Sequence, residues 1–293
     1  MKIVLLGPKG QLGWELQRSL APLGELIALD RAQGADLADP QALAALVRSH
    51  APQVIVNAAA YTAVDKAQSE QALCHAVNAD SPAALAEVAR DLGALLVHYS
   101  TDYVFDGSGT APRDENAQTG PLSVYGTTKL AGEQAIQASG CAHLILRTSW
   151  VYAARGGNFA KTMLRLAAER EQLKVINDQI GAPTGADLLA DVSAHLIRAT
   201  LARPELSGLY HLVAAGETSW HAYARHVIEF ARARGTPIKV APDQILPIAT
   251  TEYPTPARRP LNSRLSTAKL QQAFGLTLPD WRTGVERMLT EIL

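Results

Sequence analysis

The first twenty residues combine a short strand pattern, a glycine-rich turn and a helix pattern, in that order. Lys2–Leu6 is mostly apolar and ends at the turn Gly7–Gly13, whose sequence is GPKGQLG. Leu12, Leu16 and Leu20 then recur at every fourth position, which places them on one face of a helix. Strand, glycine turn and helix form the context of a dinucleotide-binding fingerprint, here with the variant spacing G-x-x-G-x-x-G.

The three glycines of this turn have separate roles in such a fingerprint. Gly7 and Gly10 let the backbone come close to a pyrophosphate at the N-terminus of the following helix. Gly13 lets the helix pack closely on the strand. We therefore predict that the chain begins with a binding site for a dinucleotide cofactor.

The second strand pattern, Leu26–Leu29, ends at Asp30. An acidic residue at this position binds the ribose hydroxyls of the adenosine and favours NAD. Arg31 follows directly and provides a cation for a 2′-phosphate, so NADP stays open as the cofactor. The alternative reading of Asp30 is a simple turn residue. Asp36 and Leu37 come shortly afterwards, where they would touch the adenine.

Strand patterns and helix patterns alternate over the first half of the chain. The predicted helices are Pro40–Ser49, Ser69–Asn78 and Pro82–Leu92, and the predicted strands are Gln53–Asn57, Ala94–Ser100 and Ala142–Arg147. This alternation predicts an α/β fold with a doubly wound parallel sheet (Rossmann) and right-handed crossovers. We assign residues 1–150 to an NAD(P)-binding domain and residues 151–293 to a smaller α/β substrate-binding region. The chain can cross between the two lobes.

After residue 150 the alternation is less regular. The predicted elements are the helices Asn158–Glu169, Gly185–Ala202 and Trp220–Ala233 and the strands Leu173–Ile176 and Gly208–Val213. The proline-rich segment Pro242–Pro260 is predicted to be mostly irregular, and it contains Arg258 and Arg259. A guanidinium suits the oxygens of a nucleotide diphosphate, so we assign Arg259 to substrate binding. The alternative is an exposed, solvated pair of arginines.

Tyr125 and Lys129 lie near the start of a further predicted helix, Val124–Ala138. Their spacing places the phenol and the ammonium on one face of that helix. A neighbouring positive charge favours the phenolate and moves its pKa down from about 10, which suits a proton donor in carbonyl reduction. Thr101 follows the strand Ala94–Ser100, where its hydroxyl can bind a substrate carbonyl beside the phenol. Taken singly, these residues also suit purely structural roles.

Composition excludes several classes of partner. The net charge is −1 and the pI is near 6.7, so the overall field does not attract nucleic acid or an anionic membrane. No run reaches the roughly 20 apolar residues that span a bilayer, and no targeting signal is recognisable. Cys74 and Cys141 have no metal-ligand spacing, and the scattered histidines are interpreted as structural. These features predict a cytoplasmic protein.

Six motifs carry a family resemblance that extends over essentially the whole chain. They are GPKGQLG from Gly7, VNAAAYT from Val56, YSTDYVF from Tyr99, YGTTKLAGE from Tyr125, RTSWVY from Arg147 and QIGAPT from Gln179. Together and in this order they resemble the dTDP-4-dehydrorhamnose reductase family of extended short-chain dehydrogenases/reductases. The resemblance implies that NADPH or NADH reduces the 4-keto group of a dTDP-6-deoxy-4-hexulose, giving dTDP-L-rhamnose.

The resemblance also implies roles for individual residues. Thr101 and Tyr125 would bind the keto oxygen, Tyr125 would donate the proton, and Lys129 would hold the nicotinamide ribose. Asp102 and Trp150 would lie against the sugar. Further cofactor contacts would be made by Gly10, Gln11, Leu12, Asp30, Asp36, Leu37, Ala60, Tyr61, Thr62 and Tyr99.

A homodimer and a bound Mg²⁺ ion are implied by the resemblance in some relatives. By position, the carboxylates of Glu15, Asp187 and Glu291 would hold the ion, with Asp187 in place of a longer glutamate. The alternative is that these are ordinary solvated carboxylates. Mg²⁺ keeps several waters and is seldom fully enclosed by protein ligands, so the sequence gives only a weak signal.

Tyr103 distinguishes this chain from the sugar 4,6-dehydratases, which have Thr-Asp-Glu where this chain has Thr101-Asp102-Tyr103. Dehydration needs a base that abstracts a proton beside the ketone, and a tyrosine cannot replace that glutamate. Reduction needs only a hydride and one proton, so we predict a reductase. A nucleotide-sugar epimerase of the same superfamily and a non-catalytic NADP-binding regulatory subunit are the alternatives.

Overall fold

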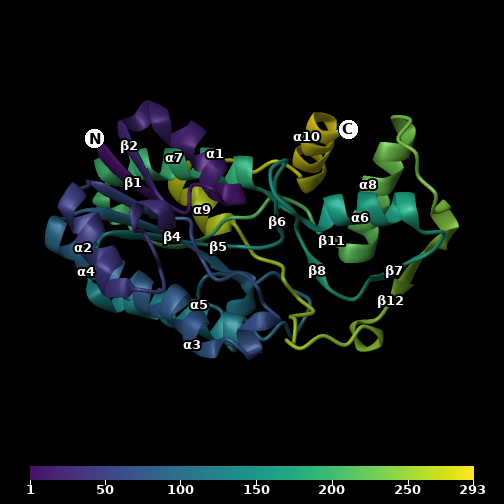
Figure 1. The fold of residues 1–293 in the computed structure, drawn as a ribbon, viewed down its shortest axis with the longest axis horizontal. Helices are drawn as coiled ribbons and strands as arrows, with labels where there is room; N and C mark the ends of the chain where they lie inside the picture. Colours follow the sequence, from purple (N-terminus) through teal and green to yellow (C-terminus); the bar gives the residue numbers. More distant parts are fainter.

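The computed structural model describes all 293 residues, which form a larger and a smaller lobe (Figure 1). A six-stranded sheet lies at the centre of the larger lobe, with the strand order β10-β5-β4-β3-β1-β2 and every pairing parallel. Its strands are β1 (Lys2–Leu6), β2 (Glu25–Leu29), β3 (Val54–Asn57), β4 (Leu95–Thr101), β5 (His143–Thr148) and β10 (Gly208–His211). The strand order reverses between β1 and β3, and ligands of such sheets bind in the crevice at this point.

Helices cover both faces of the sheet (Figure 1). Successive residues of β1 face opposite sides, so Ile3 and Leu5 belong to one buried cluster and Val4 and Leu6 to the other. The first cluster includes residues of α1 (Gln11–Leu20), α7 (Ala186–Ala202) and α9 (Ala268–Phe274). The second includes residues of α2 (Pro40–His50), α4 (Ser81–Leu92) and α5 (Val124–Ser139). The predicted doubly wound α/β fold is confirmed.

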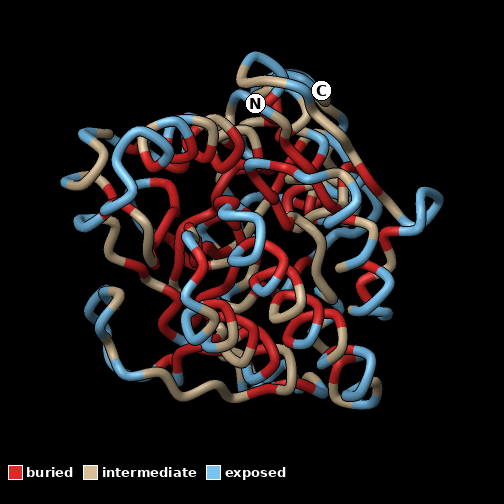
Figure 2. Tube along the Cα trace, turned by 90° about the vertical axis from the view of Figure 1, so that its left-hand side faces the viewer, coloured by how far each residue is buried: buried red, intermediate tan, exposed pale blue.

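The smaller lobe is built around α6 (Phe159–Glu169), α8 (Trp220–Ala233) and α10 (Trp281–Ile292), which share a buried aromatic and apolar cluster. Four short strands connect it to the larger lobe, namely β6 (Val151–Tyr152), β8 (Ile180–Gly181), β9 (Thr184–Gly185) and β11 (Thr218–Ser219). The chain crosses between the lobes more than once, because α7, β10 and α9 follow residue 150 and pack in the larger lobe. Figure 2 shows buried segments through the interior and exposed loops around the outside.

Some element predictions differ from the structure. Residues 69–78 are predicted as one helix, but they form α3 (Gln71–His75) and then a π-helical turn, Ala76–Asp80, that runs directly into α4. The segment 242–260, predicted to be mostly irregular, contains β12 (Ile245–Ile248), which pairs in parallel with β7 (Leu173–Ile176). Pro247 weakens the strand signal in the sequence, but it is tolerated because this sheet has only two strands and both are edges. None of the helices has the length and apolar character that a membrane crossing requires.

Candidate active site

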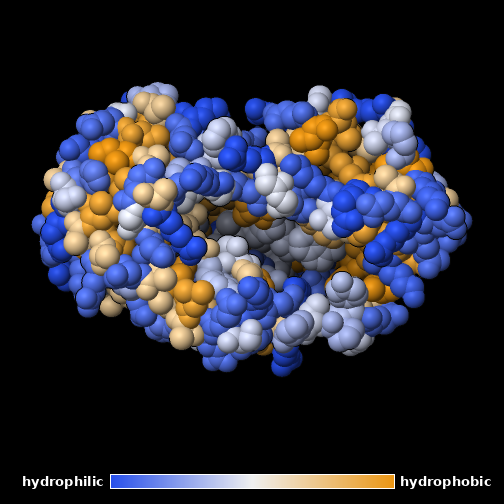
Figure 3. All heavy atoms as spheres, viewed as in Figure 1, coloured by the Kyte–Doolittle hydropathy of each residue, from blue (hydrophilic) through white to orange (hydrophobic).

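A cavity of about 630 Å³ opens between the two lobes at the carboxyl ends of the central strands. Figure 3 shows the hollow in the surface at this place. Its walls come from the β1–α1 turn, the ends of β3 and β4, the first turns of α5 and the segment 148–151, and Trp220 of α8 also lines it. The cavity therefore lies at the reversal of strand order, where a dinucleotide is expected in this type of fold.

The β1–α1 turn has the geometry that a dinucleotide requires. Gly7 has a φ of +79°, a left-handed conformation that favours glycine. A Cβ atom on Gly13 would lie 2.0 Å from the carbonyl oxygen of Gly7, so only glycine lets α1 pack this closely on the turn. Gly10 precedes α1 and no side chain caps the helix, so its first amide groups stay free to bind an anion. The turn therefore fits the pyrophosphate of the predicted cofactor.

The variant Gly13→Ala tests this packing. We expect the added methyl group to push α1 away from the turn, lowering the affinity for NADPH at least about tenfold and the free energy of unfolding by roughly 1–3 kcal/mol. Fluorescence titration with NADPH and urea denaturation measure the two effects. Gly157→Ala is the matched control, because its methyl group would meet no atom within 4 Å. Parent-like affinity in Gly13→Ala would contradict the assigned role of the turn.

Asp30 lies at the end of β2, as predicted, and it makes local contacts there. Its carboxylate accepts a hydrogen bond from the amide of Ala32 at 2.7 Å and lies 2.5 Å from Nζ of Lys9. The contact with Lys9 lowers the pKa of Asp30. Arg31 forms an ion pair with Asp36 at 3.3 Å. Lys9 therefore lies beside the carboxylate that would bind an adenosine ribose, and Arg31 lies beside that of Asp36, so both NAD and NADP stay chemically acceptable.

The cavity brings together most of the predicted site residues, but not all of them. The predicted residues that line it are Gly7, Gly10, Gln11, Leu12, Ala60, Thr62, Tyr99, Thr101, Asp102, Tyr125, Lys129 and Trp150. Those outside its wall are Gly13, Asp30, Asp36, Leu37, Tyr61 and Arg259. Leu37 is buried against the helices of one sheet face, and the Tyr61 hydroxyl donates a hydrogen bond to Glu70 at 2.6 Å. The adenosine contacts stay predictions.

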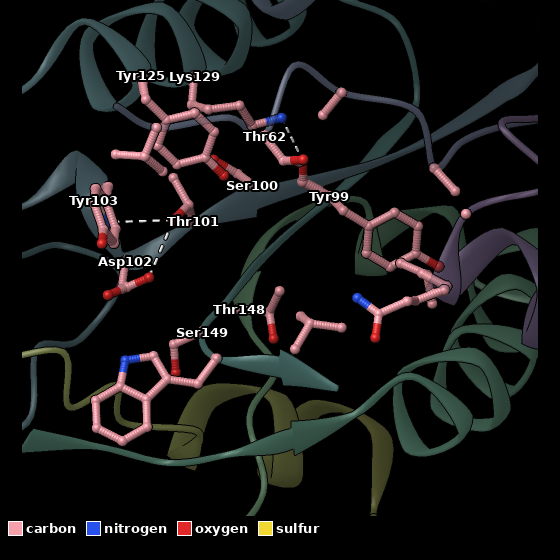
Figure 4. Close-up of a pocket in the computed structure, with 18 of the residues that line it drawn as sticks. Thr62, Tyr99, Ser100, Thr101, Asp102, Tyr103, Tyr125, Lys129, Thr148 and Ser149 are labelled. Atoms are coloured by element: carbon pink, nitrogen blue, oxygen red, sulfur yellow. Dashed lines mark hydrogen bonds between the residues drawn. The ribbon is translucent and has the colours of Figure 1, made fainter. Parts of the chain in front are cut away.

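Thr101, Tyr125 and Lys129 converge on the cavity from β4 and α5 (Figure 4). The Ser123 hydroxyl caps α5 by accepting a hydrogen bond from the amide of Gly126 at 3.2 Å. A Cβ atom on Gly126 would lie 2.2 Å from the carbonyl oxygen of Tyr103, so this glycine lets the start of α5 approach the end of β4. That approach places the Tyr125 phenol beside the Thr101 hydroxyl. The hydrogen bond with Thr101 lowers the pKa of the phenol, but burial raises that pKa by more.

The electrostatics of Tyr125 differ from the prediction. Burial raises the pKa of the Tyr125 phenol well above 10, and Lys129 is not among the groups that shift it. The reason is the direction of the lysine, whose Nζ lies 2.6 Å from the carbonyl oxygen of Tyr99 and 3.0 Å from Nε2 of His98. Burial also lowers the pKa of Lys129 to about 8. The prediction that Lys129 lowers the pKa of Tyr125 is therefore wrong for the side chains as they lie here. Burial keeps the phenol protonated.

Asp102 and Trp150 lie on the side of the cavity away from the glycine turn. Asp102 is 2% exposed and accepts a hydrogen bond from the Thr101 hydroxyl at 3.0 Å, and burial raises its pKa to about 6. Trp150 has a φ of +50°, a strained value for a bulky side chain. Its ring stacks on that of Trp220 with 3.6 Å between centroids. Trp220 thus joins the site from α8, and nothing in its sequence context indicates this.

A second cavity of about 400 Å³ lies beside the first and shares Tyr103 and Trp220 with it. Its wall is mainly aromatic and aliphatic, with the cations Arg170, Lys174 and Arg259 at its edge. Arg259 already binds both carboxylate oxygens of Asp65, at 3.1 and 2.9 Å. Its predicted contact with a diphosphate stays a prediction.

The three carboxylates predicted to bind Mg²⁺ line one small cavity together with Arg287. Arg287 lies 3.7 Å from Asp187 and 3.6 Å from Glu291, and Arg18 lies 3.5 Å from Glu15. Each carboxylate therefore faces a guanidinium, and no group of three or more metal-ligating side chains is close enough to hold an ion. The residues as placed do not fit the predicted Mg²⁺ site.

The family model described as "RmlD substrate binding domain" matches residues 1–293. The chain belongs to this family. A curated family member, the dTDP-4-dehydrorhamnose reductase of Escherichia coli strain K12, is 58% identical over 100% of this chain and 98% of its own length. The resemblance inferred from the motifs is confirmed.

Two solved structures have the same fold over nearly the whole chain. The crystal structure of a dTDP-4-dehydrorhamnose reductase from Clostridium acetobutylicum matches with a TM-score of 0.89 and 35% identity, covering 100% of this chain and 99% of that one. The dTDP-4-dehydrorhamnose reductase of Bacillus anthracis, solved in complex with NADP, matches with a TM-score of 0.89 and 34% identity, covering 99% of both chains.

Proposed function

We infer that the protein is an NAD(P)H-dependent oxidoreductase that reduces the 4-keto group of dTDP-4-dehydro-L-rhamnose, giving dTDP-L-rhamnose. The observation that carries this inference is the convergence of Thr101, Tyr125 and Lys129 on one cavity beside a glycine turn shaped for a dinucleotide. The full-length identity of 58% to a dTDP-4-dehydrorhamnose reductase supports the choice of substrate.

In this reaction the bound nicotinamide supplies a hydride to the carbonyl carbon. Tyr125 gives its phenolic proton to the carbonyl oxygen, so one hydride and one proton convert the ketone to an alcohol. Thr101 would hydrogen-bond that oxygen from the other side once its single hydroxyl proton turns away from Asp102, to which it donates at 3.0 Å in this structure. The raised pKa of Tyr125 keeps the phenol protonated until the substrate arrives, but it also makes the phenol a weaker acid than a general acid with a pKa near the working pH.

Tyr103 supports reduction rather than dehydration. It stands where the dehydratases have a glutamate, and burial raises the pKa of its phenol well above 10. A group that stays protonated at working pH cannot abstract a proton from the carbon beside a ketone. The site therefore holds an acid in Tyr125 but no carboxylate base at the position of Tyr103.

The second cavity is our proposed place for the nucleotide of the substrate. It adjoins the sugar end of the first cavity through Tyr103 and Trp220, and its apolar wall suits a base. Arg170 and Lys174 at its edge provide the cations that a diphosphate needs. We also propose a cytoplasmic homodimer. The two buried, unpaired cysteines suit a reducing compartment, and gel filtration with light scattering would test the dimer.

A spectrophotometric assay tests the function. We expect loss of the absorbance of reduced nicotinamide when dTDP-4-dehydro-L-rhamnose is added to the protein with NADPH or NADH, and the two rates rank the cofactors. Product analysis must show dTDP-L-rhamnose. An epimerase would change the sugar without net oxidation of the cofactor, and a regulatory subunit would bind NADPH and leave the sugar unchanged, so either result would refute the proposal.

A further inference from the structure

Residues 254–260 form an irregular segment with very little backbone support. Pro254, Pro256 and Pro260 have no amide donor. No residue of the segment takes part in a hydrogen bond between two backbone groups. The segment nevertheless follows a defined path against the protein, since Ala257 is 0% exposed. Side-chain contacts must therefore hold it in place.

The carboxylate of Asp65 supplies these contacts from the larger lobe. It accepts two hydrogen bonds from the guanidinium of Arg259, at 3.1 and 2.9 Å, and a third from the amide of Ala257 at 3.1 Å. Arg259 also donates to the Thr255 hydroxyl at 2.8 Å, which in turn donates to the carbonyl oxygen of Ala257 at 2.9 Å. We call Asp65, Thr255, Ala257 and Arg259 the Asp65 clamp. No other residue outside the segment forms a hydrogen bond with it.

The Asp65 clamp lies between the walls of the two cavities. The loop that leads to Asp65 lines the first cavity with Thr62 and Val64. At the other end of the clamp, Thr255 and Arg259 line the second cavity. Asp65 itself lines neither of them. A ligand in the second cavity would therefore touch the partners of Asp65 but not Asp65.

The charges of the clamp argue against a guanidinium that is free to bind a ligand. The hydrogen bonds with Arg259 lower the pKa of Asp65, so the carboxylate is charged at neutral pH. The side chain of Arg259 is 24% exposed and that of Asp65 is 39% exposed, so water screens the pair only in part. A diphosphate bound by Arg259 would lie beside this carboxylate and be repelled by it. The same cavity contains Arg170 and Lys174, which belong to no ion pair.

We propose that Asp65 is a positioning residue for the substrate, which holds residues 254–260 as one wall of the second cavity by binding Arg259 and the amide of Ala257. Arg259 then acts as part of this wall, and Arg170 and Lys174 bind the diphosphate. The consequence for substrate binding rests on the proposed place of the nucleotide. The structural role of Asp65 does not, and it is measured without a ligand.

Hydrogen exchange of the protein without added nucleotide tests the structural role. The amide of Ala257 donates to the Asp65 carboxylate, so we expect Asp65→Ala to speed its exchange at least about tenfold. Glu217→Ala is the matched control, because it removes a carboxylate that lies 2.6 Å from Arg264 and lines neither cavity. It should leave the exchange of Ala257 unchanged. Unchanged exchange in Asp65→Ala would overturn the proposal.

The affinity for dTDP separates the two roles of Arg259 by the sign of the change. If Arg259 is a free ligand of the diphosphate, loss of the neighbouring carboxylate should tighten the binding of the anion. If the clamp shapes the cavity, Asp65→Ala should instead weaken the binding of dTDP by about tenfold, less than the loss of a fully buried pair. Glu217→Ala changes the net charge equally and should keep the affinity within about twofold of the parent. Titration calorimetry measures these affinities, and tighter or unchanged binding in Asp65→Ala would refute the proposed role.

The double variant Asp65→Ala with Arg259→Ala tests whether the two side chains act as one unit. Each single variant already breaks the clamp, so the double variant should bind dTDP within about twofold of the weaker single variant. A guanidinium that binds the diphosphate independently of Asp65 would give effects that add in the double variant. Additive effects would therefore contradict the proposal.

Steady-state kinetics provide a further readout. No residue of the clamp lines the first cavity, where the reaction is proposed to occur. Asp65→Ala should therefore raise KM for the nucleotide sugar about tenfold and keep kcat within about twofold of the parent. A fall in kcat with an unchanged KM would indicate a general loss of structure and refute the positioning role. If the parent does not bind dTDP but Ala257 exchanges as expected, the proposed place of the nucleotide fails and the clamp stands.

Discussion

Replacing Tyr125 with phenylalanine is expected to lower kcat by roughly 10²–10⁴-fold, the range that a positioned general acid contributes. The variant removes the proton donor and leaves the ring in place. The edge-on contact with Tyr103, at 5.5 Å between ring centroids, is kept. Thr101 also keeps its hydrogen bond to Asp102, so the site loses the acid without losing its shape. We therefore expect KM and the affinity for NADPH to change little.

Steady-state kinetics, NADPH titration and circular dichroism measure these quantities on the same preparation. Tyr223→Phe is the matched control, because it removes a hydroxyl from another buried tyrosine whose oxygen has no hydrogen-bond partner. It lies in the cluster of the smaller lobe, and kcat should stay within about twofold of the parent. A Tyr125→Phe enzyme that turns over at the parent rate would show that another group supplies the proton.

Local sequence patterns were sufficient to predict the parts of the site that lie close together along the chain. The β1–α1 turn needs glycine at Gly7 and Gly13 for reasons that involve only a few neighbouring residues. Tyr125 and Lys129 share a helix, so their spacing predicts that they point the same way. For the same reason the strands and helices of the first half were recognisable from their periodicity.

Contacts between distant segments could not be predicted in this way. His98 and Lys129 come into contact only because α5 packs against β4. In the sequence, His98 is simply a polar residue within an apolar strand, and nothing there indicates its partner. The direction in which Lys129 donates is likewise set by the carbonyl oxygen of Tyr99, which a sequence does not reveal. Trp150 and Trp220 belong to different segments and meet between the lobes. The pKa values and hydrogen bonds of the site depend on these contacts between distant segments.

The buried pair Glu133 and Arg147 is the second place where one substitution should have a large effect. Glu133 on α5 is 0% exposed, and Arg147 on β5 is 4% exposed. The guanidinium donates to both carboxylate oxygens, with the shortest contact at 2.6 Å from Nη2 to Oε2. It also lies 5.0 Å from the ring centre of Phe105. The pair therefore joins α5, which carries the catalytic tyrosine, to the central sheet.

We expect Glu133→Ala to lower the free energy of unfolding by about 3–5 kcal/mol, because it leaves the Arg147 charge buried without a counter-ion. For a chain of this size the loss corresponds to a fall in Tm of roughly 6–10 °C. Urea denaturation measures the first quantity and calorimetry the second. Arg165→Ala is the control, since it removes an arginine from the exposed i,i+4 pair with Glu169 and should cost under about 1 kcal/mol.

The double variant Glu133→Leu with Arg147→Met separates the cost of an unpaired charge from the value of the pair itself. Two apolar side chains of similar volume remove both charges, so the double variant should be more stable than Glu133→Ala alone. If the double variant is as unstable as the single one, the loss comes from packing at the α5–β5 contact. If Glu133→Ala unfolds like the parent, the Arg147 charge has reached water or another anion, and the buried pair does not hold α5 on the sheet.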